Sequence, residues 1–210
     1  MRNSINIKTD FKIDNRIVKY IWIILILLII DQLVKILAYN NINIHQEIKV
    51  IGDWFRIRLE LNDGTAYAVP FKNETDRYIK ILIKFLLSIV LACCLIYFLN
   101  KKSSKTLLIG LTLCFAGTIG NLIDRVFHGV ILSNSLDKYN FEWFHGRVID
   151  MIYMPIVDTN LPNWIPFRGG ERFIFFEPVY NLADLILFIG AIISFIGLIK
   201  NRKLEKTKYQ

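Results

Sequence analysis

Two carboxylates occupy positions from which they could activate water. Asp150 follows an apolar pair in RVIDM, and Asp184 lies in YNLADLI, one turn after Asn181. Two carboxyl groups held close together cannot both ionise, so such a pair can deprotonate a water molecule and protonate a departing amine. Alternatively, Asp184 is simply a carboxylate in a helix's first turn, where the helix dipole favours negative charge. Spacing alone leaves both interpretations open.

Other charged residues interrupt apolar segments, where a charge is costly unless it is paired or faces water. Asp31 and Lys35 are four residues apart on one helix face and can neutralise each other. This favours a structural tether, with the lining of a substrate cleft as the alternative. In GTIGNLIDRV, Asn121, Asp124 and Arg125 share a helix face. The simplest interpretation is an Asp124–Arg125 ion pair that fixes the helix to the following loop.

Four apolar segments must position these groups. The chain has 210 residues and is 54% hydrophobic, which excludes a disordered chain, a disulfide-stapled secreted module and an ordinary soluble enzyme. Because about 20 apolar residues cross a bilayer as a helix, we predict membrane helices at about 17–39, 79–99, 106–126 and 181–199. They form one membrane domain over 17–199, between a polar tail at 1–16 and a basic tail at 200–210. The first segment is too long for a cleaved signal peptide.

The basic residues indicate how the helices are oriented. Lys and Arg number 26 against 18 acidic residues, a net charge of +8. They flank the apolar segments instead of forming one patch, which argues against nucleic-acid binding. By the positive-inside rule, both tails are cytoplasmic and the long connections at about 40–78 and 127–180 lie outside.

The outer connections carry a second structural signal. In FRIRLEL, apolar and charged residues alternate with the period of a half-buried strand. The fold class is therefore a mainly α membrane protein, a four-helix bundle with a small β-sheet and enlarged loops on the outer face. The three cysteines lie within apolar segments and are interpreted as small hydrophobes. The three histidines lack metal-ligand spacing, so we predict no metal site: His45, His128 and His145.

Five motifs together resemble one family. DQLVK, NDGTAYAV, GTIGNLIDR, VIDM and YNLAD occur in the order typical of lipoprotein signal peptidases, over about residues 20–199. The resemblance implies an aspartic endopeptidase that removes the signal peptide from prolipoproteins, N-terminal to a cysteine carrying diacylglycerol. It implies that Asp150 and Asp184 are catalytic. It also implies supporting polar residues at Asn62, Asn121, Arg125 and Asn181, and structural ones at Asp31, Lys35 and Asp124.

The resemblance further implies surroundings and partners. The expected partners are lipid-modified prolipoproteins, the phospholipid bilayer and globomycin-like inhibitors, with no metal or organic cofactor. The expected location is the bacterial cytoplasmic (inner) membrane, with the site at its outer face and the protein a monomer. Which aspartate is the base stays open. The rival hypotheses are an ion-coupled transporter and a non-catalytic membrane scaffold, and four helices without an inverted repeat argue against transport.

The chain departs from the family pattern in two outer segments. Arg125 and Asp150 are 25 residues apart, and Phe-His-Gly occurs twice, at 127–129 and 144–146. Removing residues 130–146 would leave DRVFHGRVIDM, the family's usual spacing, so we interpret them as a looped-out insertion. Residues 155–178 form a second enlarged loop. Both either shape substrate access or are tolerated surface insertions. Tyr67 and Tyr180 replace the family's usual phenylalanines.

Overall fold

Four long helices form the body of the protein. A computed structural model describes residues 15–62, 74–132 and 142–208, with side chains to residue 202. Each helix contains 27 residues, and each is long and apolar enough to cross a membrane: α1 (Asn15–Asn41), α2 (Glu74–Asn100), α3 (Lys105–Ile131) and α4 (Leu182–Lys208). The four predicted membrane helices are confirmed, although every one extends beyond its predicted bounds. The largest difference is at the C-terminal end of α4, which continues nine residues beyond the predicted end at 199. Helix α2 begins five residues earlier than predicted, with Glu74 and Asp76 in its first turn.

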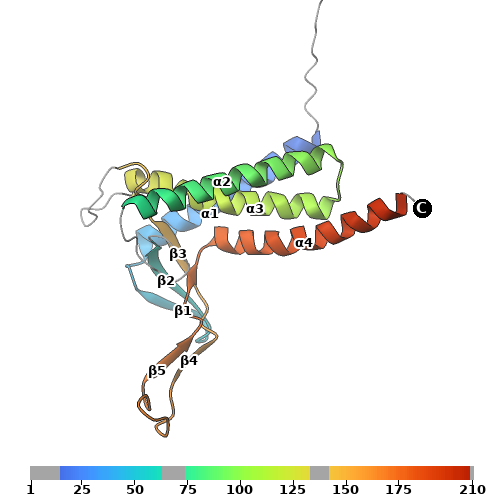
Figure 1. The fold of residues 1–210 in the computed structure, drawn as a ribbon. Helices are drawn as coiled ribbons and strands as arrows, with labels where there is room; N and C mark the ends of the chain where they lie inside the picture. Colours follow the sequence, from blue (N-terminus) through green and yellow to red (C-terminus); the bar gives the residue numbers. More distant parts are fainter. Residues whose placement is uncertain (1–14, 63–73, 133–141, 209–210) are drawn as a thin grey trace, which may run out of the picture.

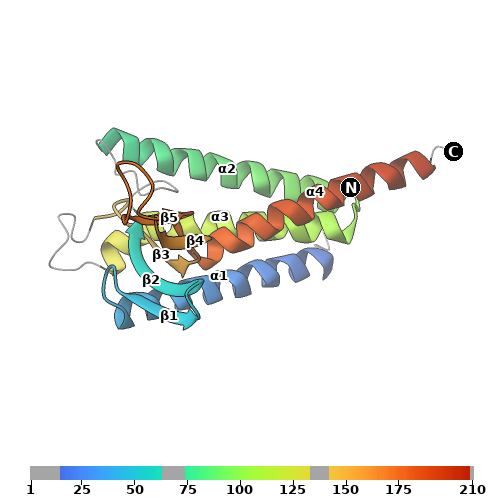
Figure 2. The ribbon, with the colours of Figure 1, turned by 90° about the horizontal axis from the view of Figure 1, so that it is seen from below.

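Helix α3 is the centre of the bundle. Within its most apolar stretch 67% of the residues are buried, against 17%, 17% and 22% for α1, α2 and α4. It packs against each of the other three helices, and Figure 2 shows it between α1 and α2 with α4 in front. The large side chains that remain exposed on α1, α2 and α4 are aliphatic and aromatic, for example Leu37, Ile83 and Phe188. Such a surface suits contact with lipid tails.

Helices α3 and α4 approach each other through glycines. A Cβ atom added at Gly110 would lie 2.4 Å from the backbone nitrogen of Ser194. One added at Gly197 would lie 2.5 Å from the Cα atom of Leu107. Only a residue without a side chain fits at such a backbone contact, as is common between membrane helices. These contacts fix the middle of α4 against the N-terminal part of α3.

A four-stranded antiparallel sheet covers one end of the bundle. Its strand order is β1-β2-β3-β6 (Figure 1), with β1 (Glu47–Ile51), β2 (Phe55–Asn62), β3 (Val148–Tyr153) and β6 (Val179–Tyr180). The predicted strand is confirmed as β2, but its strict alternation is wrong. The two buried residues of β2, Arg56 and Leu59, are three positions apart. The register of β2 against β3 shifts between Ile57 and Glu60, and such a bulge turns the side chains that follow it to the other face of the sheet.

The two enlarged connecting segments differ from each other. Residues 155–178 contain a hairpin of β4 (Val157–Asn160) and β5 (Arg172–Phe175), which projects from the sheet end of the bundle across the helix axes (Figure 1). The 130–146 insertion begins as helix, because α3 continues to Ile131. It returns beside its starting point, where the Gly146 N–H donates to the Arg125 carbonyl at 3.1 Å. Most of the predicted turn at NDGTAYAV, including Tyr67, lies outside the described residues.

Candidate active site

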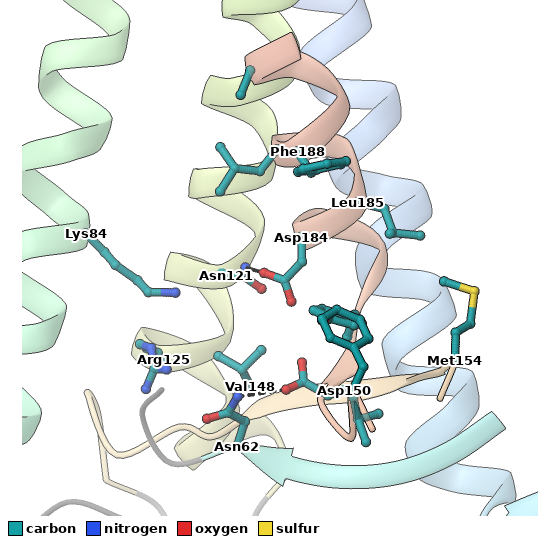
Figure 3. Close-up of a pocket in the computed structure, with 15 residues that line it drawn as sticks. Asn62, Lys84, Asn121, Arg125, Val148, Asp150, Met154, Asp184, Leu185 and Phe188 are labelled. Atoms are coloured by element: carbon teal, nitrogen blue, oxygen red, sulfur yellow. Dashed lines mark hydrogen bonds between the residues drawn. The ribbon is translucent and has the colours of Figure 1, made fainter. Parts of the chain in front are cut away.

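Two aspartates from different elements line one cavity at the junction of sheet and bundle (Figure 3). Asp150 lies on β3, and Asp184 lies in the first turn of α4. The cavity has a volume of about 720 Å³. Its polar side also receives Asn62 from β2 and both Asn121 and Arg125 from α3. The structure therefore brings together the two aspartates that the sequence could not place relative to each other.

Asp150 is almost completely buried, with 2% of its surface exposed. Two amide groups hold its carboxylate. The Nδ2 of Asn62 donates to Oδ2 at 2.8 Å, and the Nδ2 of Asn181 donates to Oδ1 at 2.6 Å. Both oxygens thus accept a hydrogen bond from a neutral donor, which orients the carboxyl group without a counter-charge at either oxygen.

Asp184 and Asn181 close the N-terminus of α4 as a reciprocal cap. The Asp184 N–H donates to Oδ1 of Asn181 at 3.0 Å, and the Asn181 N–H donates to Oδ2 of Asp184 at 3.3 Å. The other Asp184 oxygen accepts a 2.7 Å hydrogen bond from Nδ2 of Asn121. The first-turn interpretation of Asp184 is therefore confirmed, and the same carboxylate lines the cavity.

Burial sets the protonation of Asp150. Loss of water around the carboxyl group, and secondly the nearby charge of Asp184, raise the pKa of Asp150 from 3.8 to about 7. The amide donors of Asn62 and Asn181 oppose this rise because they favour the charged form. Near neutral pH, Asp150 therefore retains a proton for much of the time. A protonated carboxyl group beside a second carboxylate can serve acid and base steps at one site.

A buried ion cluster supports the cavity from behind. The Lys35 ammonium lies 2.8 Å from Asp31 and 2.7 Å from Asp124, and donates to Oδ1 of Asn121 at 3.2 Å. Oδ1 of Asp31 accepts the N–H of Ala183 at 2.9 Å. The predicted tether between Asp31 and Lys35 is thus confirmed, and it joins α1, α3 and α4. The partner predicted for Asp124 was wrong: its carboxylate binds Lys35 of α1 instead of its neighbour in sequence.

One residue of the cavity was missed by the sequence analysis. Lys84 of α2 lines the cavity, and Figure 3 shows its ammonium directed toward the side that holds Asn121 and Asp184. The sequence did carry a signal, because Lys84 lies within the apolar segment 79–99. A charge within a membrane helix is costly unless it is paired or faces water, which makes such a lysine a candidate site residue.

The wall of the cavity along α4 is apolar. It includes Leu185, Leu187, Phe188 and Ala191, and Met154 faces the same space from the strand side. A polar floor beside an apolar wall can accept a peptide bond next to a hydrophobic segment or an acyl chain.

The described residues contain no cluster of three or more His, Cys, Asp or Glu side chains suited to a metal ion. His128 instead lies buried at the end of α3, where its Nε2 is 3.2 Å from Oε1 of Gln32. His145 contacts Glu74 at 3.0 Å. Each of these histidines thus contacts an oxygen of a neighbouring helix, α1 for His128 and α2 for His145.

Comparison with known proteins identifies a family. The family model for signal peptidase (SPase) II matches residues 23–200. A lipoprotein signal peptidase of Porphyromonas gingivalis is 37% identical over 188 residues, covering 83% of this chain and 80% of that protein. One from Amoebophilus asiaticus is 35% identical over 178 residues, covering 82% and 74%. A solved bacterial membrane enzyme is similar with a TM-score of 0.59 and 25% identity, covering 88% of this chain and 89% of the other.

Proposed function

This chain belongs to the signal peptidase II family, a family of bacterial membrane proteases, and we propose that it is an aspartic endopeptidase acting on prolipoproteins. It removes the signal peptide by cutting on the N-terminal side of a cysteine that carries diacylglycerol. The observation that supports this best is the shared cavity, in which Asp150 and Asp184 meet between a polar floor and an apolar wall.

The two aspartates divide the proton work. Asp184 is the general base, since its negative charge is favoured at the N-terminus of α4 and by the amide donor of Asn121. Asp150, whose pKa is raised to about 7 by burial, supplies the proton. Asp184 takes a proton from water as the oxygen attacks the scissile carbonyl, and Asp150 gives one to the departing amine as the C–N bond breaks.

The neighbouring polar residues hold this arrangement. Asn62 and Asn181 orient Asp150, and Asn121 orients Asp184. Arg125 is buried and lines the cavity, from which its guanidinium binds carbonyl oxygens of the substrate. The cluster of Asp31, Lys35 and Asp124 is structural. A globomycin-like inhibitor occupies the same cavity.

The arrangement of the helices supports an outer-face position for the cavity. Both described ends of the chain lie at the end of the bundle opposite the sheet (Figures 1 and 2). With the basic tails in the cytoplasm, the cavity opens at the outer face of the inner membrane, where a lipidated cysteine would be held by its acyl chains. The described residues that line the cavity all come from one copy of the chain, which supports a monomer as the active form.

The direct test is cleavage of a diacylglyceryl-modified prolipoprotein by purified protein, followed as a mobility shift. Asp150→Asn and Asp184→Asn should each abolish cleavage while the protein stays folded. Asp53→Asn is the matched control, because the Asp53 side chain is 74% exposed between β1 and β2 and does not line the cavity. Globomycin should inhibit the wild type and Asp53→Asn alike. Cleavage retained by either cavity variant would remove that residue from the mechanism.

A further inference from the structure

The β4–β5 hairpin ends in exposed aromatic side chains. In its tip, residues 161–171, Trp164 is 81% exposed and Phe167 is 103% exposed. Single exposed apolar residues are ordinary, but adjacent large ones usually mark a contact surface. The tip therefore needs an explanation beyond the fold of this chain.

The strands of the hairpin are two-faced. Val157 lies opposite Phe175, and the next pair on that face is Thr159 with Phe173. The apolar side chains of this face remain open, with Phe175 53% exposed. The opposite face carries the ion pair of Asp158 and Arg172. A two-stranded sheet is marginally stable in water when nothing covers its apolar face, so this face calls for an apolar neighbour.

The tip is held in a defined shape. The Leu161 N–H donates to the Glu171 carbonyl at 2.8 Å, and the Gly170 N–H donates to the Leu161 carbonyl at 2.9 Å. Phe167 has a φ of +67°, a left-handed conformation that is unfavourable for a residue with a side chain. Internal hydrogen bonds thus hold an aromatic ring outward at some cost, which is typical of a functional contact.

The base of the hairpin is fixed to the main sheet. Asp158 lies 2.8 Å from the buried guanidinium of Arg56 on β2 and 2.8 Å from Arg172. Arg168 pairs with Glu171 at 2.9 Å. The hairpin's charges are therefore largely paired, so it has little net charge with which to attract anionic groups.

The direction of the hairpin matches a membrane surface. It leaves the bundle at the sheet end and runs across the helix axes, beyond α4, instead of continuing along them (Figure 1). When the four helices span a bilayer, a segment in this direction runs along the bilayer surface. Tryptophan is the side chain that prefers this interface, because its ring is apolar while its N–H can bind water or headgroups.

We propose that the β4–β5 hairpin is an interfacial membrane anchor, which inserts Trp164 and Phe167 into the headgroup region of the leaflet at the sheet end of the bundle. The attachment is hydrophobic, so it operates on zwitterionic lipid. Phe176, directly after β5, lines the cavity with the two aspartates. The anchor thereby holds that wall of the cavity at the bilayer surface. This proposal concerns membrane attachment and does not depend on the cleavage chemistry.

The experiment uses Trp164 as its own probe. The chain has four tryptophans, so Trp22→Phe, Trp54→Phe and Trp143→Phe together leave Trp164 alone. This full-length protein is reconstituted in phosphatidylcholine vesicles, with and without lipids brominated at shallow or deep acyl positions. We expect blue-shifted emission, quenching by shallow brominated lipid and protection from iodide. Adding Phe167→Ser should weaken all three. The matched control keeps Trp54 as the single tryptophan, in which Phe167→Ser should change nothing.

Three results would overturn the anchor. The first is water-like emission from Trp164, free quenching by iodide and no quenching by brominated lipid. The second is quenching that requires anionic lipid and disappears in high salt, which would indicate electrostatic attachment. The third is protection that arises only when a prolipoprotein is added, which would make the hairpin a protein-docking surface. Because Phe167 is fully exposed, Phe167→Ser leaves the fold intact, as gel filtration would verify.

Discussion

Asp150 should limit the stability of the protein at neutral and alkaline pH. Burial raises its pKa from 3.8 to about 7, so folding favours the protonated carboxyl group. The contribution of Asp150 to the free energy of unfolding is therefore fully present below pH 3.8, where the carboxyl group is protonated in both states. This contribution is lost as the pH rises through about 7. At about 1.4 kcal/mol per tenfold change in ionisation, the loss is about 4 kcal/mol. Asp150→Asn removes the titration and should therefore stabilise the protein at high pH.

The hydrogen bonds reduce this gain by a definite amount. Asp150 accepts one amide donor on each oxygen, whereas an asparagine offers one oxygen and one NH₂. The amide of Asn181 is fixed by the N–H of Asp184, so the conflict falls on Asn62 and costs about 1 kcal/mol. The variant should exceed the wild type in stability by roughly 3 kcal/mol at pH 8 and by less than about 1 kcal/mol at pH 5.

Thermal unfolding in detergent at pH 5, 6, 7 and 8 measures the difference. The stability advantage of Asp150→Asn over the wild type grows between pH 5 and pH 8. For a chain of this size, this growth corresponds to a rise of roughly 5–10 °C in the Tm of the variant relative to that of the wild type. Asp158→Asn is the control, because Arg172 and Arg56 hold the pKa of Asp158 at about 2. Asp158 is ionised throughout this range, so the effect of its substitution should be constant with pH. A stability difference for Asp150→Asn that is the same at pH 5 and pH 8 would refute the reasoning.

Three further predictions test the surroundings of the cavity. Lys84→Met removes a cation from the cavity that holds the two carboxylates, so the acidic limb of the kcat/KM profile should move up by about one pH unit. Lys84→Arg keeps the charge and should leave the limb in place. An unchanged profile in Lys84→Met would contradict an electrostatic role of Lys84 at the site. Lys35→Met leaves two buried carboxylates without their cation and should lower the free energy of unfolding by about 3–5 kcal/mol; an unchanged Tm in detergent would be inconsistent with the cluster. Gly110→Ala places a Cβ against the α4 backbone and should cost about 1–3 kcal/mol in the same assay, whereas Cys93→Ala on the exposed side of α2 should cost far less.

The parts of the fold that could be predicted are those set by local composition. Four apolar segments of membrane-crossing length define four helices, because the bilayer core leaves few alternatives. The Asp31–Lys35 contact follows from a spacing of four on one helix. The helix ends could not be predicted equally well. Hydropathy marks only the apolar part of a membrane helix. The helices of this protein continue into polar end turns, such as the first turn of α2 with Glu74 and Asp76, and these turns carry no hydropathy signal.

The parts that could not be predicted depend on contacts between distant residues. Asp124 binds Lys35, from another helix, although its sequence neighbour Arg125 is the more obvious partner. The bulge between Ile57 and Glu60 depends on how β2 pairs with β3, which no alternation pattern contains. The hairpin at 155–178 was predicted only as an enlarged loop, since its proline- and glycine-rich tip indicates a turn but not the pairing of β4 with β5.

The side-chain amides of Asn121 and Asn181 connect the structural contacts of this protein with its two cavity aspartates. An ammonium can only donate, so Lys35 requires the oxygen of Asn121 on its side, which turns the Nδ2 of Asn121 toward Asp184. The cap of α4 likewise uses the oxygen of Asn181, which turns its Nδ2 toward Asp150. Neither amide can rotate without losing a donor contact. A buried ion cluster and a helix cap, both ordinary devices of stability, therefore decide that each aspartate of the cavity meets a hydrogen-bond donor. Weakening either device should disturb the aspartate that it orients before it unfolds the bundle.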